Sequence, residues 1–233
     1  MVQGLSEVSL AAKMITDRRV GWFLHRMSPQ QTRAQNRHRR ILDAALRVFS
    51  QQGYRNASVD EIADESQTSK GGVYFHFPGK EAIFLALLNR TAARLLEKID
   101  EAMVSHDDPI AKADAALFAV LRTFAKHRAL ARLFMVEALG AGRGFHRRMA
   151  EIRDEFAAVI QRHLDEAVKQ GVIEPIDTEI AGRAWFGALN DVITNWVLSG
   201  RPEPLEDAYV ALRPLLMRSV GIAEQPYSPV QER

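Results

Sequence analysis

The sequence predicts an all-α protein with a small N-terminal helix-turn-helix unit and a larger C-terminal helical bundle. Apolar residues recur at three- and four-residue steps along most of the chain, whereas alternating β-branched stretches are scarce. Glycine, proline and capping residues divide this pattern into segments of helical length. We therefore expect an extension over residues 1–30, a helix-turn-helix unit over 31–79, a bundle over 80–220 and a tail over 221–233.

The first helix is expected from about residue 31 to residue 52. Leu42, Ala45, Leu46 and Phe49 fall at i, i+3, i+4 and i+7, which places them on one buried face. Gly53 suits the left-handed position that commonly ends a helix. The preceding Met27-Ser28-Pro29 looks like a natural start, so we expect residues 1–26 to be a dispensable extension.

Two short helix signals follow within residues 58–80. Ser58 and Glu61 form a Ser-x-x-Glu capping box, and Ser69 can cap a second helix after a short polar break. The second helix begins with small or basic residues and ends with polar-tipped ones: Lys70, Gly71, Gly72, Tyr74 and His76. A helix, a tight turn and a short second helix with polar groups at its exposed end are typical of a DNA-reading helix-turn-helix.

Basic charge is concentrated beside this motif. Residues 31–57 have a local excess of five positive charges, although the whole chain has a formal net charge of only +2. The arginines are Arg33, Arg37, Arg39, Arg40, Arg47 and Arg55, and Asp43 is the only acid in the segment. A solvated helix face would have the same composition, but next to a helix-turn-helix the charge favours phosphate binding.

The remaining segments predict a helical bundle. Helices are expected at about 80–105, 110–126, 130–139, 145–170, 178–199 and 205–220, with a kink at Pro214. Their ends are marked by Pro78-Gly79, Asp108-Pro109, the glycines at 140, 142 and 144, Asp177, and Gly200-Arg201-Pro202. The helix at 178–199 is apolar nearly all round, so it must be covered on more than one side. We expect it to form a homodimer interface with the helix at 205–220, because paired half-sites on DNA require a twofold partner.

Composition excludes several classes of protein. The 233 residues include no cysteine, which rules out disulfides, thiolate metal sites and cysteine catalysis. No apolar run is long enough to span a membrane, and the first residues do not form a secretory signal. We expect a cytoplasmic protein that contacts no membrane.

Residues 37–90 resemble the DNA-binding domain of the TetR/AcrR family of bacterial transcriptional regulators. The matching residues are Ile41-Leu42-Asp43-Ala44-Ala45 with Phe49, Gly53-Tyr54, Ser58-Val59, Ile62-Ala63, Ser69-Lys70-Gly71, Val73-Tyr74, His76-Phe77 and Lys80-Glu81. The resemblance implies a homodimer that reads a palindromic operator and releases it when a small molecule binds the C-terminal domain.

The resemblance also implies roles for individual residues. Tyr74 and His76 match phosphate and base contacts of the recognition helix, while Ser58 and Lys80 match phosphate contacts. Gly72 stands where many members carry a base-reading side chain. The expected DNA-binding set is Arg37, Arg39, Ser58, Ser69, Lys70, Gly71, Gly72, Tyr74, His76 and Lys80.

The effector is expected among the middle helices, which are rich in apolar residues. The candidate ligand-binding residues are Phe118, Leu121, Phe134, Glu137, Phe156, His163, Trp185 and Asn190. The apolar members suit cavity walls or ordinary core packing, and the polar members need partners if they are buried. Residues 185–200 are similar to acyl-CoA-responsive members of the family, which implies a long-chain acyl-CoA or another lipophilic effector; a drug-like or aromatic compound is the competing expectation.

Two other classes of function fit the sequence less well. A helical-bundle enzyme is disfavoured because no histidine follows a glutamate by three residues and no His-Glu-x-x-His or Gly-x-Ser-x-Gly motif occurs. We therefore expect no catalytic residue, metal or cofactor. A DNA-binding architectural protein without an effector would leave the large second helical unit unexplained.

Overall fold

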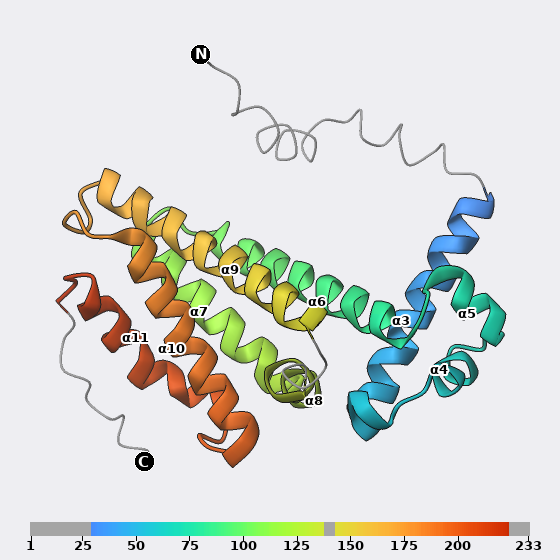
Figure 1. Ribbon diagram of the computed structural model, residues 1–233. Coiled ribbons are helices and arrows are strands. Elements are labelled where there is room, and N and C mark those ends of the chain that lie inside the picture. Colours follow the sequence, from blue (N-terminus) through green and yellow to red (C-terminus); the bar gives the residue numbers. More distant parts are fainter. Residues whose placement is uncertain (1–28, 138–142, 224–233) are drawn as a thin grey trace.

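The computed structural model describes residues 29–137 and 143–223, whose helices form a small head and a larger bundle (Figure 1). These ranges contain helices and no strand, which confirms the predicted all-α class. The expected extension lies outside the described residues except for its last two positions, and so does the tail beyond residue 223.

The head consists of α3 (Pro29–Asn56), α4 (Val59–Glu65) and α5 (Lys70–His76). Gly53 interrupts α3 with a φ of 80°, as its left-handed preference predicts, and the last turn continues to Asn56. Ile41, Phe49, Ile62 and Val73 are fully buried where the three helices meet. These residues belong to a core that the head shares with α6, η2 and α9, and this core holds α5 on the surface.

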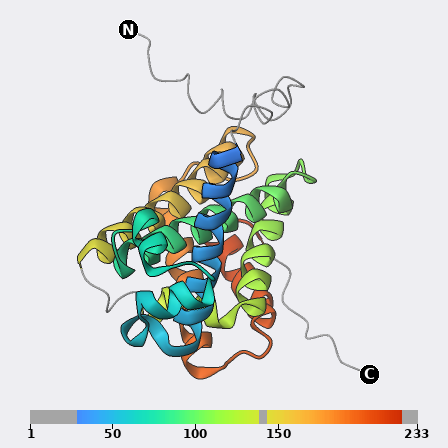
Figure 2. The same ribbon diagram turned by 90° about the vertical axis from the view of Figure 1, so that its right-hand side faces the viewer.

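The bundle lies to one side of the head, and the rotated view in Figure 2 shows its long helices stacked behind α3. Its helical elements are α6 (Lys80–Met103), α7 (Pro109–Lys126), α8 (Arg128–Arg132), η2 (Leu133–Glu137), α9 (Arg143–Lys169), α10 (Thr178–Ser199), η4 (Leu205–Asp207) and α11 (Ala208–Ser219). Asp108 and Asp177 cap α7 and α10 as expected, each accepting a hydrogen bond from a backbone N–H of the first turn. No helix within the described ranges combines the length and apolar character needed to cross a bilayer.

Three elements differ from the sequence expectations. The expected helix at 130–139 is instead α8 followed by η2, a single π-helical stretch. Helix α9 begins at Arg143, so Gly144 is helical, whereas Gly140 and Gly142 lie outside the described residues. The expected helix at 205–220 is instead a 3₁₀ turn at 205–207 followed by α11, which contains Pro214 as predicted. These departures depend on packing between helices, which local periodicity does not encode.

Phe84 on α6 joins the head to the bundle. Its ring lies 5.3 Å from the ring of Phe49 and 4.8 Å from that of Tyr54, both on α3. On the other side it lies 5.7 Å from Phe134 on η2 and 4.9 Å from Phe145 on α9. Aromatic pairs at these separations are favourable beyond the area that they bury. The first turns of α6 are therefore packed against the head and the bundle at once.

Two polar contacts reinforce this junction. Arg90 on α6 pairs with Asp43 on α3 at 2.8 Å. The Lys80 ammonium donates to the carbonyl oxygens of Tyr54, Arg55 and Ala57 at 2.9, 3.1 and 2.8 Å and lies over the Tyr54 ring. These carbonyls belong to the end of α3 and the segment after it, which have no helical donors of their own.

Replacing Lys80 with Met removes three charge-assisted hydrogen bonds and leaves the carbonyls at the end of α3 without their donor. We expect Lys80→Met to lower the free energy of unfolding by about 2 kcal/mol. Urea denaturation of the full chain measures this change, and Lys98→Met, at an exposed position of the same helix, is the matched control. Equal stability of the two variants would show that the Lys80 contacts do not stabilise the junction.

Candidate DNA-binding surface and effector cavity

A tight turn positions α5 against α4. Ser66 is buried, and its hydroxyl donates to the carbonyl of Ala63 at 3.1 Å. Gln67 adopts a left-handed conformation with a φ of 51°, which reverses the chain direction between the helices. The turn therefore fixes the angle at which α5 is presented.

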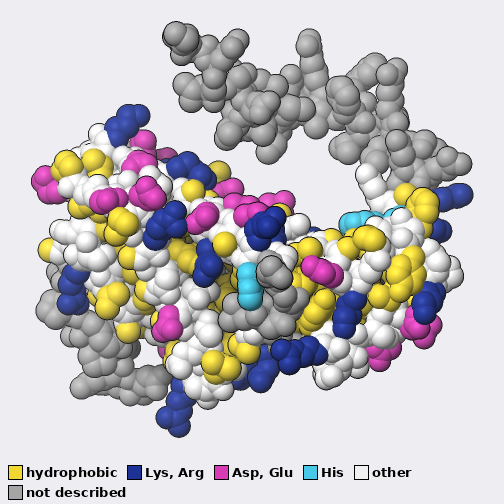
Figure 3. All heavy atoms as spheres, in the orientation of Figure 1, with side chains coloured by type: hydrophobic (Ala, Val, Ile, Leu, Met, Phe, Trp, Pro, Cys, Tyr) yellow, Lys and Arg dark blue, Asp and Glu magenta, His cyan; other side chains and the backbone are white. Residues whose placement is uncertain are grey.

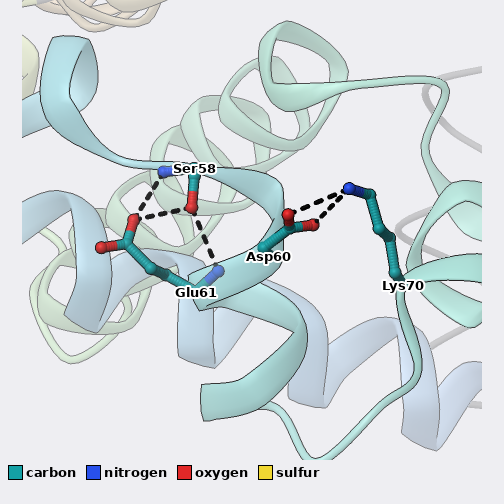
Figure 4. Close-up of polar contacts among 4 residues, drawn as sticks. All are labelled: Ser58, Asp60, Glu61 and Lys70. Carbon is teal, nitrogen blue, oxygen red and sulfur yellow. Dashed lines mark hydrogen bonds and ion pairs between the residues drawn. The ribbon is translucent and has the colours of Figure 1, made fainter.

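Side-chain caps fix the starts of both short helices. The backbone N–H of Ser58 donates to the Glu61 carboxylate at 2.7 Å, and the N–H of Glu61 donates to Ser58 Oγ at 3.2 Å (Figure 4). This is the predicted capping box, and the hydrogen bonds from Ser58 lower the pKa of Glu61. At the start of α5, Ser69 Oγ accepts from the N–H of Gly72 at 3.1 Å. Ser58 and Ser69 are thus occupied in holding the helix ends.

Lys70 links the two helices on the surface. Its ammonium lies 2.9 Å from the Asp60 carboxylate of α4, and both side chains are exposed (Figure 4). The hydrogen bond to Asp60 raises the pKa of Lys70, so the ammonium stays charged. Lys70 lies in the region expected to bind DNA, where its ion pair also restrains α5.

The outer face of α5 carries aromatic side chains. Tyr74 is 46% exposed and Phe75 is 83% exposed, whereas Val73 and Phe77 on the opposite face are buried. The sequence reasoning missed Phe75. The signal was available, because Val73 and Phe77 stand at i and i+4 and therefore assign Phe75 to the outer face.

His76 ends α5 and lies beside α3. Its ring is 6.2 Å from that of His38, which in turn lies 4.7 Å from the ring of Phe77. Burial, and then the positive charge of Arg37, lower the pKa of His76. Its Nε2 atom has no hydrogen-bond partner among the described residues. The atom is itself buried, so it is not presented to a molecule bound on the outer face of α5.

The two glycines of α5 differ in their surroundings. A Cβ atom at Gly72 would lie 2.8 Å from Thr68 Cγ2 and 3.1 Å from Ser69 Oγ, whereas a Cβ at Gly71 would meet nothing within 4 Å. Gly72 therefore faces the capping turn. The open position at the start of α5 is Gly71.

The other expected DNA-binding residues lie on α3 and α6. Arg37 and Arg39 are exposed on α3, and Arg39 donates to Asn36 Oδ1 at 3.1 Å. The family resemblance implies that Lys80 contacts a phosphate. In this structure its ammonium is directed instead to the three carbonyls at the end of α3. Figure 3 shows Lys and Arg side chains along the edge of the molecule where α3 and α5 lie.

A largely apolar cavity of about 190 Å³ lies within the bundle. Its walls come from α6, α7, α9, α10, the α8–η2 segment and the end of α11. On α6 the lining runs from Leu88 to Met103, which is about 22 Å at 1.5 Å per residue. Some lining residues, such as Leu88 and Phe134, belong to the core that the head shares with α6, η2 and α9, while others, such as Trp185, belong to the core of the rest of the bundle. The cavity therefore lies between the two cores and is elongated along α6.

Only some of the expected ligand-binding residues line the cavity. Those that line it are Phe134, Phe156, His163, Trp185 and Asn190. Leu121 is buried but is not part of the lining. Glu137 is the last residue of η2. Phe118 is on the surface, with its ring 5.8 Å from that of Tyr209.

Polar groups are few and lie toward different ends of the cavity. Thr178 bonds to Asp165 and Arg183 pairs with Asp154, so α10 runs antiparallel to α9. Asn190 therefore lies toward the head, and His163 lies toward the far end of the cavity. Neither side chain has a hydrogen-bond partner among the described residues. Burial is the main cause that lowers the pKa of His163, which favours the neutral ring.

Two family models match the chain. Residues 41–87 match the model described as "Bacterial regulatory proteins, tetR family", and residues 106–213 match a "Tetracyclin repressor-like, C-terminal domain". The first covers most of the head, and the second covers most of the bundle.

Individual relatives agree with these models. The fatty acid metabolism regulator protein of Bacillus subtilis is 23% identical over 164 residues, covering 70% of this chain and 84% of the relative. The transcriptional regulator SrpR of Pseudomonas putida is 29% identical over 176 residues, covering 72% and 76%.

Solved structures share the fold. The fatty acid degradation regulator FadR of Bacillus halodurans has a TM-score of 0.73 at 23% identity, covering 85% of this chain and all of the other. FadR of Bacillus subtilis in complex with stearoyl-CoA has a TM-score of 0.71 at 22% identity, covering 79% and 98%.

Proposed function

The chain belongs to the TetR family of bacterial transcriptional regulators, and we propose that it represses transcription from a palindromic operator until a long-chain lipophilic effector enters its cavity. The observation that carries this proposal is the elongated apolar cavity in the bundle, whose lining residues belong both to the core that packs against the head and to the core of the rest of the bundle. A ligand in that position contacts the helix that holds the DNA-binding head.

Helix α5 is the element that enters the major groove of the operator. Tyr74 and Phe75 project from its outer face, and His76 is its last residue. Gly71 has no side chain, so the backbone at the start of α5 can approach the DNA closely. Ser58, Ser69 and Lys70 support this surface through caps and an ion pair.

The homodimer forms through α10 and α11. Ile180 and Leu198 on α10 are each 61% exposed, and Leu215 on α11 is 59% exposed. Ala184 and Gly187 lie between the first two on the same face of α10, and a Cβ at Gly187 would meet nothing within the protomer. An exposed glycine inside a helix costs about 1 kcal/mol relative to alanine. Close approach of a second copy accounts for both the glycine and the exposed apolar side chains.

The effector is a linear apolar molecule, with a long-chain acyl-CoA as the leading candidate. The cavity is long along α6, its walls are aliphatic and aromatic, and polar side chains occur at only a few points. A relative of the same fold was crystallised with stearoyl-CoA. The acyl chain fills the cavity, and His163 or Asn190 bonds to its polar end.

Binding acts on α6 through Phe134, which lies both in the cavity wall and at the junction with the head. Phe134 lines the cavity and also packs on Phe84, which holds α6 against α3. A ligand that fits only when Phe134 and α6 are displaced favours that conformation by its differential affinity. The two α5 helices of the dimer then no longer match both half-sites.

This arrangement needs no cofactor, and no metal-binding cluster of His, Asp or Glu occurs in the part of the chain that the structure describes.

The DNA-binding role is tested by footprinting the purified protein on its own genomic DNA and measuring affinity for the protected fragment. We expect Tyr74→Ala and Phe75→Ala each to weaken binding about tenfold, because each removes a groove contact of roughly 1–3 kcal/mol. Phe118→Ala, which removes an exposed aromatic on α7, is the control. Unchanged affinity of both α5 variants would overturn the assignment of α5 as the recognition helix.

The effector role is tested by calorimetric titration with palmitoyl-CoA, with free coenzyme A as the ligand control. Ala113→Phe places a ring in the cavity that Ala113 lines, and we expect it to weaken palmitoyl-CoA binding at least about tenfold. Operator affinity without ligand should be retained. Ala93→Phe, at an exposed position of α6, is the matched control. Absence of heat with the unaltered protein would exclude acyl-CoA as the effector.

The dimer is tested by sedimentation equilibrium of Gly187→Arg, which inserts a large charged side chain into the proposed interface. We expect a monomer that retains its helical circular dichroism but binds the full operator weakly, because each protomer then engages one half-site alone. Ala93→Arg adds the same charge on α6 and should remain dimeric. A dimeric Gly187→Arg protein would place the interface elsewhere.

A further inference from the structure

One arginine interrupts the apolar wall of the cavity. Arg153 on α9 lines it, and no Asp, Glu, Lys or second Arg does so among the described residues. The other basic lining residue is His163, and burial is the main cause that lowers its pKa, so its ring is neutral at physiological pH. Within the described part of the wall, an occupant therefore meets a positive charge at Arg153 alone.

Arg153 lies where the cavity approaches the surface. It lines the cavity and is also an exposed residue, whereas the neighbouring Ile152 is buried. Long basic side chains cover apolar surface with their methylene stem while the charged end stays in water. The guanidinium is therefore expected at the lip of the cavity, between the apolar interior and the solvent.

The carboxylates that are close to Arg153 in the sequence are paired with other groups. Glu151 and Glu155 both pair with Arg148, at 3.0 and 2.8 Å, and Asp154 pairs with an arginine of α10 at 2.9 Å. Arg153 itself has no ion pair or hydrogen bond with a described residue. Its fork of N–H donors is thus left for an external anion, and that geometry suits a carboxylate or a phosphate.

The cavity beyond Arg153 is suited to an apolar chain. On α9 the lining continues from Phe156 to Ala167, and every lining residue in that stretch except His163 is apolar. From Arg153 to Ala167 the helix rises about 21 Å at 1.5 Å per residue. The lining of α6 from Leu95 to Met103 is apolar as well. A cation at the lip and a long apolar interior match the two parts of an anionic amphiphile.

Asn190 lies on the same side of the cavity as the lip. Helices α9 and α10 lie side by side (Figure 1) and are joined by the pair of Asp154 and Arg183. Because the helices are antiparallel, Asn190 lies about 10 Å nearer the head than this pair, and His163 lies about 14 Å from it in the opposite direction. A polar group bound by Arg153 therefore lies at the Asn190 side, and the chain extends toward His163.

We propose that Arg153 selects effectors that carry an anionic group, by binding a carboxylate or a phosphate at the lip of the cavity while the attached chain extends along α9. This inference deepens the proposed function and rests on it, because it requires the cavity to be the effector site. A neutral lipid of equal length fills the apolar part but leaves the guanidinium without a partner. The effector is therefore an acidic amphiphile and not an uncharged lipid or drug-like compound.

The test measures the dissociation constants of three ligands by calorimetric titration of the full chain. Palmitate offers a carboxylate, palmitoyl-CoA offers phosphates, and 1-hexadecanol has a chain of the same length without charge. Arg153→Met removes the charge but keeps an apolar stem, and Arg153→Lys keeps the charge. Arg147→Met, at an exposed position of α9 outside the cavity wall, is the matched control.

We expect the unaltered protein to bind at least one anionic ligand at least about tenfold more tightly than 1-hexadecanol. Arg153→Met should weaken binding of that ligand about tenfold to a hundredfold, because it removes charge-assisted hydrogen bonds, and should leave binding of 1-hexadecanol unchanged. Arg153→Lys should retain most of the affinity, and Arg147→Met all of it. A loss confined to palmitate identifies a carboxylate as the bound group, and a loss confined to palmitoyl-CoA identifies a phosphate.

Two outcomes would overturn the inference. One is unchanged affinity of Arg153→Met for both anionic ligands. The other is an equal loss for 1-hexadecanol and the anionic ligands, which would show that Arg153 contributes only the packing of its stem. Failure of the proposed function looks different, because the unaltered protein would then bind none of the three ligands, and the inference would fall with it.

Discussion

The packing of Phe84 between the head and the bundle is the interaction on which the rest of the molecule depends. Its ring contacts Phe49 and Tyr54 of α3 on one side and Phe134 and Phe145 of the bundle on the other. The helix that carries it is also fixed to α3 by polar contacts of Lys80 and Arg90. Because one helix belongs to both cores, a change in the bundle cannot remain local.

The cavity lies against this shared helix. Its lining includes Leu88 of the core that the head shares with the bundle and Trp185 of the second core, so the proposed ligand would contact both. The π-helical stretch η2 lies at the same junction, and such stretches occur frequently at functional sites. Phe84 and Phe134 contact each other there, and Arg90 pairs with Asp43. The junction therefore combines an aromatic layer with an ion pair.

Features that depend on neighbouring residues were predictable from the sequence, while those that depend on tertiary packing were not. The capping box of Ser58 and Glu61 and the cap at Asp177 follow from local hydrogen bonding, and both form as expected. The π-helical stretch was missed because it depends on the helices around it. Phe118 has the same apolar character as the cavity residues, but the rotation of α7 places it on the surface. Lys80 fits a phosphate contact by family pattern, yet the backbone of α3 ends within reach of its ammonium.

The two adjacent glycines of α5 have different consequences for the evolution of new specificities. Gly72 is constrained by the capping turn, so most side chains there would disturb the start of the recognition helix. Gly71 is not constrained by its own protein, because a side chain at that position extends into open space on the exposed surface. A single codon change at position 71 therefore adds a side chain to the exposed face of α5 without disturbing the packing around it. Under the proposed role of α5 in DNA binding, divergence to a different set of target genes has its easiest starting point there.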